Sequence, residues 1–330
     1  LIGIRRKVST ESGSVRDRIR AARPIAIVLP GTMGSSLSAA GDRVWLEYLD
    51  LAFGGLEKLT IDAPDVAATD LLGDFYGDLL VFLSRSHKVR PYAYDWRQSL
   101  DGAVAGMATL VEQALSDCEL SDQPLHLVAH SMGGLVARLT LARNPQLWER
   151  MRALPGSCLL MLGTPNQGSH EAVRWLTGLN PTLSKLRLLD ITNGRNDLLK
   201  IVSRFPGLLE LLPSTSSGRD FADAGFWSDL RAQLEEDWPL PQRAALRGLR
   251  GIWGELRNAP VDPERMLYVA GCAPTYSNHG FTPQLSALET VEAGLEGIEF
   301  GQDIGLPVQE AFFKAHGFDG TGAEEGEALV

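Results

Sequence analysis

Apolar residues fall into short runs that are separated by stretches of helical spacing. The runs have the length and composition of buried strands, and they lie at residues 24–29, 88–94, 125–128, 157–162 and 266–270. Between them, apolar positions recur at helical spacing over residues 71–84 and 104–118. Strands that alternate with helices predict an α/β fold with a doubly wound, mostly parallel sheet.

The run at residues 125–128 leads into an abrupt change of pattern. Ser131 lies among small residues, with Ala129 before it and Gly133 and Gly134 after it, and a helical pattern follows. A sharp strand-to-helix turn of this kind raises a serine hydroxyl above the sheet edge, and its strained backbone needs small neighbours. The arrangement therefore indicates a nucleophilic serine. The other interpretation makes Ser131 an ordinary N-cap serine.

A loop of small residues, at positions 30–37, follows the first predicted strand. Ligands of doubly wound sheets bind outside the carboxyl ends of the strands, so this loop and the Ser131 turn are expected at one edge. A nucleophilic serine needs backbone N–H donors for the developing oxyanion, from the residue after the nucleophile and from the first loop. The sequence thus predicts the amides of Met132 and Met33 as oxyanion donors. A simple turn is the alternative for the loop.

Four segments together resemble the lecithin:cholesterol acyltransferase family of α/β-hydrolases, which includes lysosomal phospholipase A and bacterial relatives. They are Leu29–Leu37, Tyr94–Arg97, Ala129–Gly134 and Gly163–Ser169, and their order and rough spacing match over about residues 24–170. The resemblance implies Ser131 as nucleophile, the amides of Met33 and Met132 as the oxyanion hole, and a structural pairing of the aspartate and arginine in Tyr94–Arg97. Members of this family cleave an acyl ester of a glycerophospholipid and pass the acyl group to an alcohol or to water.

The last third of the chain departs from the family pattern, because it has no Gly-Asp-Gly-Thr-Val-like segment. In the order Ser, acid, His, the base must follow the acid. His170 comes too early, and His279 follows the 266–270 strand too closely to leave room for an acid. His316 follows an expected last strand and is the predicted base; a free surface histidine is the alternative.

The predicted acid is Asp303, which follows the apolar-flanked segment 297–300. Glu296 is the alternative and has more normal spacing to His316, whereas Asp319 comes after the histidine and would break the order. A third interpretation is that the end of the chain is divergent or truncated, so that the catalytic triad of serine, acid and histidine is incomplete.

Composition narrows the class of protein further. The chain has 330 residues, and its formal net charge of −10 argues against a nucleic-acid partner. No pattern for a cofactor or a metal is present, so none is expected. Cys118, Cys158 and Cys272 are widely spaced and are interpreted as buried thiols rather than a disulfide, which favours a reducing, cytoplasmic compartment. No run is long enough to span a membrane, and no signal peptide is recognised.

The expected organisation is a hydrolase core interrupted by a cap. It comprises a polar arm at 1–23, the first part of the core at 24–169 with a lid excursion near 42–60, a mainly helical cap at 170–262, the last part of the core at 263–316, and a disordered tail at 317–330. Residues 41–72 lack clean periodicity and are expected to be irregular.

The apolar lid and cap point to a lipid ester as substrate, since a long acyl chain needs an apolar tunnel. The expected function is therefore a serine-dependent acyl ester hydrolase or acyltransferase of phospholipase A or lipase type, with transient contact with a membrane surface. Two alternatives remain open. One is an esterase acting on a non-lipid substrate, and the other is a catalytically impaired module that binds lipid or a protein partner.

Overall fold

The computed structural model describes residues 23–45, 55–180, 183, 194–214, 219–234 and 237–270. Its centre is a parallel sheet in the order β5-β1-β6-β7-β8. The strands are β1 (Ile25–Leu29), β5 (Lys88–Pro91), β6 (Leu125–His130), β7 (Cys158–Leu162) and β8 (Met266–Val269). Ile25 of β1 lies opposite Leu125 of β6 and Lys88 of β5, which sets the register of the centre. The predicted parallel sheet is confirmed.

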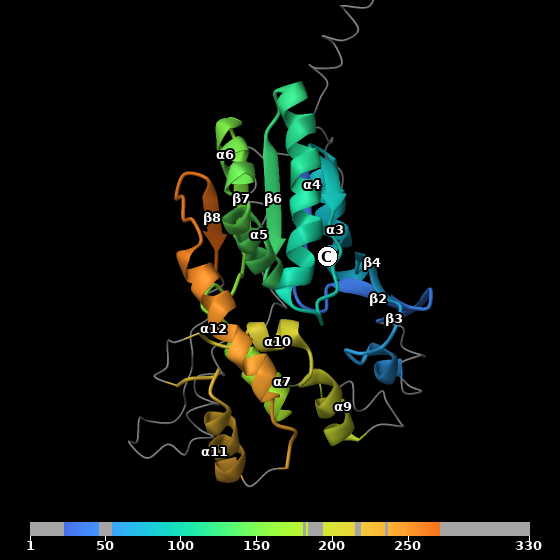
Figure 1. Cartoon of the computed structure of the whole chain (residues 1–330). Coiled ribbons are helices and arrows are strands. Elements are labelled where there is room, and N and C mark those ends of the chain that lie inside the picture. The colour runs from blue at the N-terminus through green and yellow to red at the C-terminus, as the bar shows by residue number, and fades with distance from the viewer. Residues whose placement is uncertain are drawn as a thin grey trace, which may run out of the picture.

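Side chains along β1 alternate between two apolar clusters, one on each face of the sheet. Ile25, Ile27 and Leu29 join the larger cluster, whereas Ala26 and Val28 join the smaller one. The larger cluster contains side chains of α4 (Leu100–Ser121), α5 (Met132–Arg143) and α6 (Pro145–Ala153), and the smaller one contains side chains of α3 (Gly73–Ser84). Helices therefore cover both faces, as a doubly wound sheet requires (Figure 1).

The prediction of irregular structure at residues 41–72 is wrong. A second, antiparallel sheet has the order β3-β2-β4 and comprises β2 (Ser35–Ala39), β3 (Asp42–Trp45) and β4 (Val66–Leu71). The short helix η1 (Gly55–Leu59) lies between β3 and β4. Sequence periodicity missed these strands because β4 is half-exposed on both faces and β2 is built largely of serine. β2 also takes up the end of the predicted 30–37 loop.

Where the structure describes the segment between residue 170 and the start of β8, helices alternate with irregular stretches. The segment contains α7 (His170–Thr177), α9 (Arg195–Val202), α10 (Pro206–Glu210), α11 (Ala224–Leu234) and α12 (Arg243–Asn258). Figure 1 shows these helices beyond one end of the parallel sheet, with α11 farthest from it. Within the described ranges, no helix is both long and apolar enough to cross a membrane.

Two buried histidines form a hydrogen-bonded pair at the start of β5 and β6, at the end of the sheet away from Ser131. His126 Nε2 lies 3.0 Å from the Gly156 carbonyl, which can only accept, so His126 Nδ1 accepts from His87 Nε2 at 2.9 Å. His87 Nδ1 then accepts from Ser86 Oγ at 2.8 Å. Both rings are neutral in this chain of bonds. Burial, the His126 charge and the Arg23 charge together lower the pKa of His87 to about 4, and burial also lowers the pKa of His126.

Protonation of this pair is expected to lower the free energy of unfolding in mild acid. Folding lowers the pKa of His87 from 6.5 to about 4. The neutral ring therefore contributes fully to the free energy of unfolding above pH 6.5, and this contribution is lost as the pH falls toward 4. Between pH 7.5 and 5.0, His87 alone should remove about 2 kcal/mol from the free energy of unfolding. Urea unfolding at the two pH values measures the difference between the wild type and His87→Gln, whose amide keeps a donor for His126. Equal pH dependence in the two proteins would contradict the prediction.

Candidate active site

Ser131 occupies a strained turn between β6 and α5. Its backbone has φ 50° and ψ −123°, in the region that favours glycine, and its side chain is buried. The Ser131 amide donates to the Leu162 carbonyl of β7 at 2.8 Å, which ties the turn to the neighbouring strand. The sequence predicts such a turn at this serine. As the residue before the first turn of α5, Ser131 has no side-chain capping bond, which argues against the N-cap interpretation.

Gly133 and Gly134 allow the first turn of α5 to pack very close to two loops. A Cβ atom on Gly133 would lie 2.6 Å from the Pro30 carbonyl oxygen, and one on Gly134 would overlap the Thr164 side chain. Real Cβ atoms do not approach other atoms this closely, so each position needs glycine. The first turn of α5 is therefore packed directly against the loop after β1 and the loop after β7.

The loop after β1, residues 30–34, reaches the serine itself. A Cβ on Gly31 would lie 2.9 Å from Ser131 Cβ, and Met33 has a positive φ of 63°. Aromatic side chains hold this loop in place. Tyr94 Oη donates to the Pro30 carbonyl at 2.7 Å, and Trp45 Nε1 donates to the Met33 carbonyl at 2.9 Å.

The backbone amides of Met33 and Met132 are free to bind a ligand atom. Within the described residues, neither N–H donates a hydrogen bond. Met132 is the first residue of α5, where the N–H has no partner within the helix and the helix dipole favours negative charge. The geometry therefore leaves two unpaired donors on the two segments that meet at Ser131.

Tyr76 of α3 connects the loop to the turn. The Gly31 amide donates to Tyr76 Oη at 2.8 Å, and Tyr76 Oη and His130 Nδ1 share a hydrogen bond, also at 2.8 Å. Burial lowers the pKa of His130. Burial also raises the pKa of Tyr76 to about 12. His130 is thus a hydrogen-bonding residue beside Ser131. Tyr76 was missed because it looks like one more apolar position of its helix.

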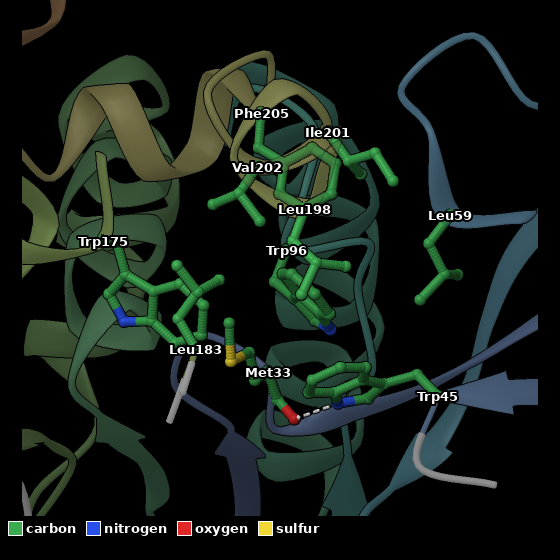
Figure 2. Close-up of a pocket in the computed structure, with 10 residues that line it drawn as sticks. All are labelled: Met33, Trp45, Leu59, Trp96, Trp175, Leu183, Leu198, Ile201, Val202 and Phe205. Carbon is green, nitrogen blue, oxygen red and sulfur yellow. Dashed lines mark hydrogen bonds between the residues drawn. The ribbon is translucent and has the colours of Figure 1, made fainter. Parts of the chain in front are cut away.

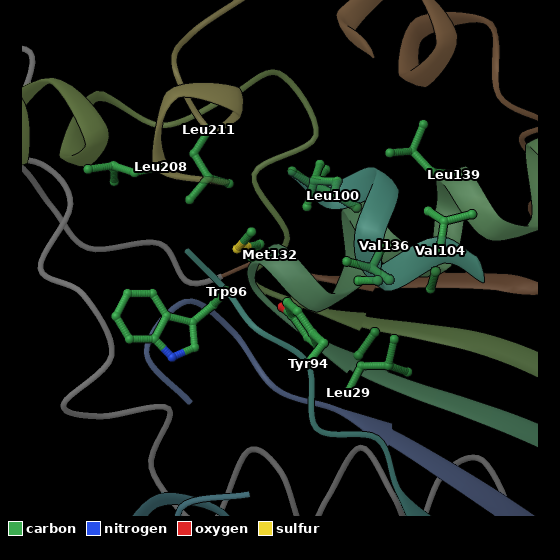
Figure 3. Close-up of a cluster of buried hydrophobic side chains, with 14 of the residues drawn as sticks. Leu29, Tyr94, Trp96, Leu100, Val104, Met132, Val136, Leu139, Leu208 and Leu211 are labelled. Atoms are coloured by element: carbon green, nitrogen blue, oxygen red, sulfur yellow. The ribbon is translucent and has the colours of Figure 1, made fainter. Parts of the chain in front are cut away.

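An entirely apolar pocket lies beside Met33. The pocket is narrow, with a cavity volume of about 20 Å³, and it is partly open to solvent. Figure 2 shows its lining, which comes from the loop after β1, the antiparallel sheet, η1, the segment after β5 and the segment after residue 170. The lining residues are Met33, Trp45, Leu59, Trp96, Trp175, Leu183, Leu198, Ile201, Val202 and Phe205. Beside it, Trp96 and Met132 pack with Leu208 and Leu211 of the cap at the end of the sheet (Figure 3).

Arg97 is almost fully buried and pairs with Asp95, as the family resemblance implies. Arg97 Nη2 lies 2.6 Å from Asp95 Oδ2, and Arg97 Nη1 donates to the carbonyls of Leu59 and Thr60 at 2.9 and 3.0 Å. This guanidinium therefore fixes η1, at the end of the expected lid, next to the segment that carries Trp96. Its role is structural.

The remaining predicted site residues fall outside the described residues. These are His316, Asp303 and the alternative acid Glu296. Of the histidines that are not predicted as the base, His126 is buried in the histidine pair, and His170 begins α7 and contacts the Phe221 ring. Among the described residues, no group of histidines, cysteines and acids could hold a metal ion. Cys118 and Cys158 are free and buried, and Cys272 lies beyond the described residues.

A parallel sheet covered by helices on both faces, with a strained serine between a strand and a helix, defines the α/β-hydrolase class. Residues 80–239 match the model of the family described as lecithin:cholesterol acyltransferase, so the resemblance seen in the sequence is confirmed.

Among solved structures, the chain is similar to the crystal structure of Bacillus licheniformis lipase BlEst2 in mature form. The two are 15% identical with a TM-score of 0.31, and the match covers 68% of this chain and 63% of that chain. The chain thus spans less than two thirds of the lipase to which it is similar. No curated protein matches the sequence.

Proposed function

We propose that this protein is a serine-dependent acyl ester hydrolase or acyltransferase of phospholipase A or lipase type, which forms an acyl-enzyme on Ser131. The observation that carries the proposal is the strained Ser131 turn, at which the free amides of Met33 and Met132 meet. A serine hydroxyl held at the end of a strand beside two unpaired donors suits the attack on an ester carbonyl.

In the proposed reaction, Ser131 Oγ attacks the carbonyl carbon and its proton passes to His316. The carbonyl oxygen becomes an oxyanion, and the Met33 and Met132 amides donate to it. As the intermediate collapses, the alcohol leaves with the proton from His316, and the acyl group stays on Ser131. Water or an acceptor alcohol then attacks the acyl-enzyme with the same assistance. Asp303 is the proposed acid that orients His316, with Glu296 as the alternative.

The apolar pocket supports a lipid ester as substrate. All of its lining side chains are apolar or aromatic, and Met33, whose amide is a proposed oxyanion donor, is one of them. Burying a methylene group contributes about 0.8 kcal/mol, so a long acyl chain in this pocket would gain binding energy that a short chain cannot. Under this proposal residues 42–60 act as the lid and 170–262 as the cap, and the protein contacts a membrane surface transiently to extract its substrate.

A fluorophosphonate probe tests the proposed nucleophile. The expected result is one adduct on the folded wild type, located on Ser131 by peptide mass spectrometry and absent from Ser131→Ala. His316→Ala should lose most of the labelling, and Asp303→Ala and Glu296→Ala should identify the acid. If the folded wild type shows no labelling, the proposed function is wrong and a non-catalytic binding module becomes the better account.

A series of p-nitrophenyl esters from acetate to palmitate tests the substrate class. kcat/KM is expected to rise with acyl length in the wild type. Ile201→Trp narrows the pocket from a half-buried position and should lower kcat/KM for chains of twelve or more carbons about tenfold, with acetate unchanged. Val81→Trp, at an exposed position on α3, is the matched control. Activity that falls as the chains lengthen would favour a non-lipid esterase.

Tyr76→Phe is expected to lower kcat without raising KM. The change leaves the Gly31 amide and His130 Nδ1 without their shared partner, which frees the oxyanion loop to shift, and a shift of about 1 Å costs about 100-fold in rate. Tyr92→Phe is the control, because it removes a tyrosine hydroxyl that donates to Ala103, at 2.6 Å, instead of to the loop. Steady-state kinetics on one ester compares the three proteins; equal kcat values would exclude this role of Tyr76.

A further inference from the structure

Glu210 is a buried acid that the proposed reaction does not use. It ends α10, inside the apolar run Leu208-Leu209-Glu210-Leu211-Leu212, and is only 7% exposed. Burial raises the pKa of its carboxyl group to about 7, with the charge of Asp101 adding to the effect and Arg143 opposing it. Burying a carboxyl group costs free energy unless it is hydrogen-bonded, so the contacts of Glu210 should explain its presence.

Both carboxylate oxygens of Glu210 bind the start of α4. Ser99 Oγ donates to Oε1 and the Leu100 amide donates to Oε2, each at 2.7 Å. Ser99 is the N-cap of α4, where backbone amides lack helical partners and the helix dipole favours an acceptor. The Glu210 carbonyl accepts from Trp253 Nε1 of α12 at 3.3 Å. Glu210 thus joins two cap helices to the first turn of a core helix.

The same helix, α10, lies directly on the Ser131 turn. The Gly207 amide donates to the Arg97 carbonyl at 3.1 Å. A Cβ at Gly207 would lie 2.6 Å from the Gln98 carbonyl oxygen and 2.9 Å from Met132 Cε, so this position is too close to the core for any side chain. Figure 3 shows Leu208 and Leu211 of this segment facing Met132 and Trp96. Phe205, just before α10, lines the apolar pocket.

This close contact requires α10 to keep a fixed position over the core. Apolar packing from the leucines around Glu210 would not by itself fix that position, because such packing is not directional. The two hydrogen bonds of Glu210 are directional and come from one fixed helix end. They set the position of α10 along α4, and through it the position of Phe205 in the pocket.

We propose that Glu210 is a positioning residue that locks the cap segment α10 in register over the Ser131 turn and so holds the acyl pocket in shape. The proposal rests on the proposed function for its kinetic consequence. Geometry rather than charge carries the effect: a protonated or amide side chain can still accept from Leu100 and bond to Ser99.

The test compares Glu210→Ala and Glu210→Gln with the wild type. Glu210→Ala should lower kcat/KM about tenfold for p-nitrophenyl palmitate, chiefly through KM, and leave the acetate ester within threefold. Glu210→Gln should restore both activities to within threefold of the wild type. Glu255→Ala is the control, since it breaks another contact between α12 and the core, the ion pair with Arg143 at 2.7 Å, and leaves both hydrogen bonds of the Glu210 carboxylate in place.

Hydrogen exchange gives a readout that does not depend on activity. The amides of residues 207–212 should exchange faster in Glu210→Ala and at the wild-type rate in Glu210→Gln. If Glu210→Ala fails to fold, Ser99→Ala is compared with the wild type instead, because it removes one of the two hydrogen bonds of the Glu210 carboxylate. Unchanged exchange, an equal loss for both esters, or failure of Glu210→Gln to rescue would each overturn the inference. A wild type that Ser131 probes do not label, with exchange as expected, would reject the proposed function alone.

Discussion

Replacing Ser131 by glycine is expected to abolish acyl ester hydrolysis and, at the same time, to stabilise the fold. The loss of activity should be at least about 10⁴-fold, since the proposed nucleophile is removed. The gain in stability follows from the backbone, because φ 50° and ψ −123° at Ser131 suit glycine. Relief of such strain contributes about 1–3 kcal/mol, and the greater freedom of glycine in the unfolded chain offsets about 0.4–1 kcal/mol of it.

The net expectation for Ser131→Gly is a free energy of unfolding about 1 kcal/mol above that of the wild type. Denaturant titration measures it, and a p-nitrophenyl ester assay of the same preparation measures activity. Ser131→Ala is the matched control, because alanine also lacks the hydroxyl but keeps the strain. The glycine variant should therefore be more stable than the alanine variant. A glycine variant that is less stable than both other proteins would show that the turn is not strained.

Replacing Gly133 by alanine should damage both the fold and the activity. The new Cβ would lie 2.6 Å from the Pro30 carbonyl oxygen and 2.9 Å from that of Leu29. These are backbone atoms of β1 and of the loop after β1, so neither can rotate out of the way, and the loop must move as a unit. Overpacking of this kind costs about 3 kcal/mol, and a loop displaced by about 1 Å should cost about 100-fold in kcat.

Two other glycines separate these effects. At Gly134 the obstacle is the Thr164 side chain on the loop after β7, so Gly134→Ala should reduce stability with a smaller effect on kcat. Gly248 is exposed on α12 with open space around it, and Gly248→Ala should stabilise the protein by about 0.5–1 kcal/mol. Thermal unfolding and ester kinetics are measured for all three variants. A Gly133→Ala protein with wild-type kcat would contradict the close approach of α5 to the loop.

The central sheet was predictable because its signals are local. β1, β6 and β7 are short, largely apolar runs, and a parallel strand buried on both faces gives this pattern. The absence of strand patterns between residues 170 and 262 agrees with the helices that the structure describes there. The antiparallel sheet was not, since the half-exposed β4 and the serine-rich β2 give no period of two.

The sequence by itself determined the chemistry that the chain can attempt. The small residues around Ser131 are intelligible without coordinates, because only a sharp turn requires them, and they point to the two segments that meet there. Only the tertiary structure decided what surrounds that serine. Tyr76, Trp45 and Glu210 come from α3, from β3 and from the cap, and their hydrogen bonds join positions from 12 to 110 residues apart. Such contacts depend on how the helices and sheets pack, and no local pattern of residues encodes them.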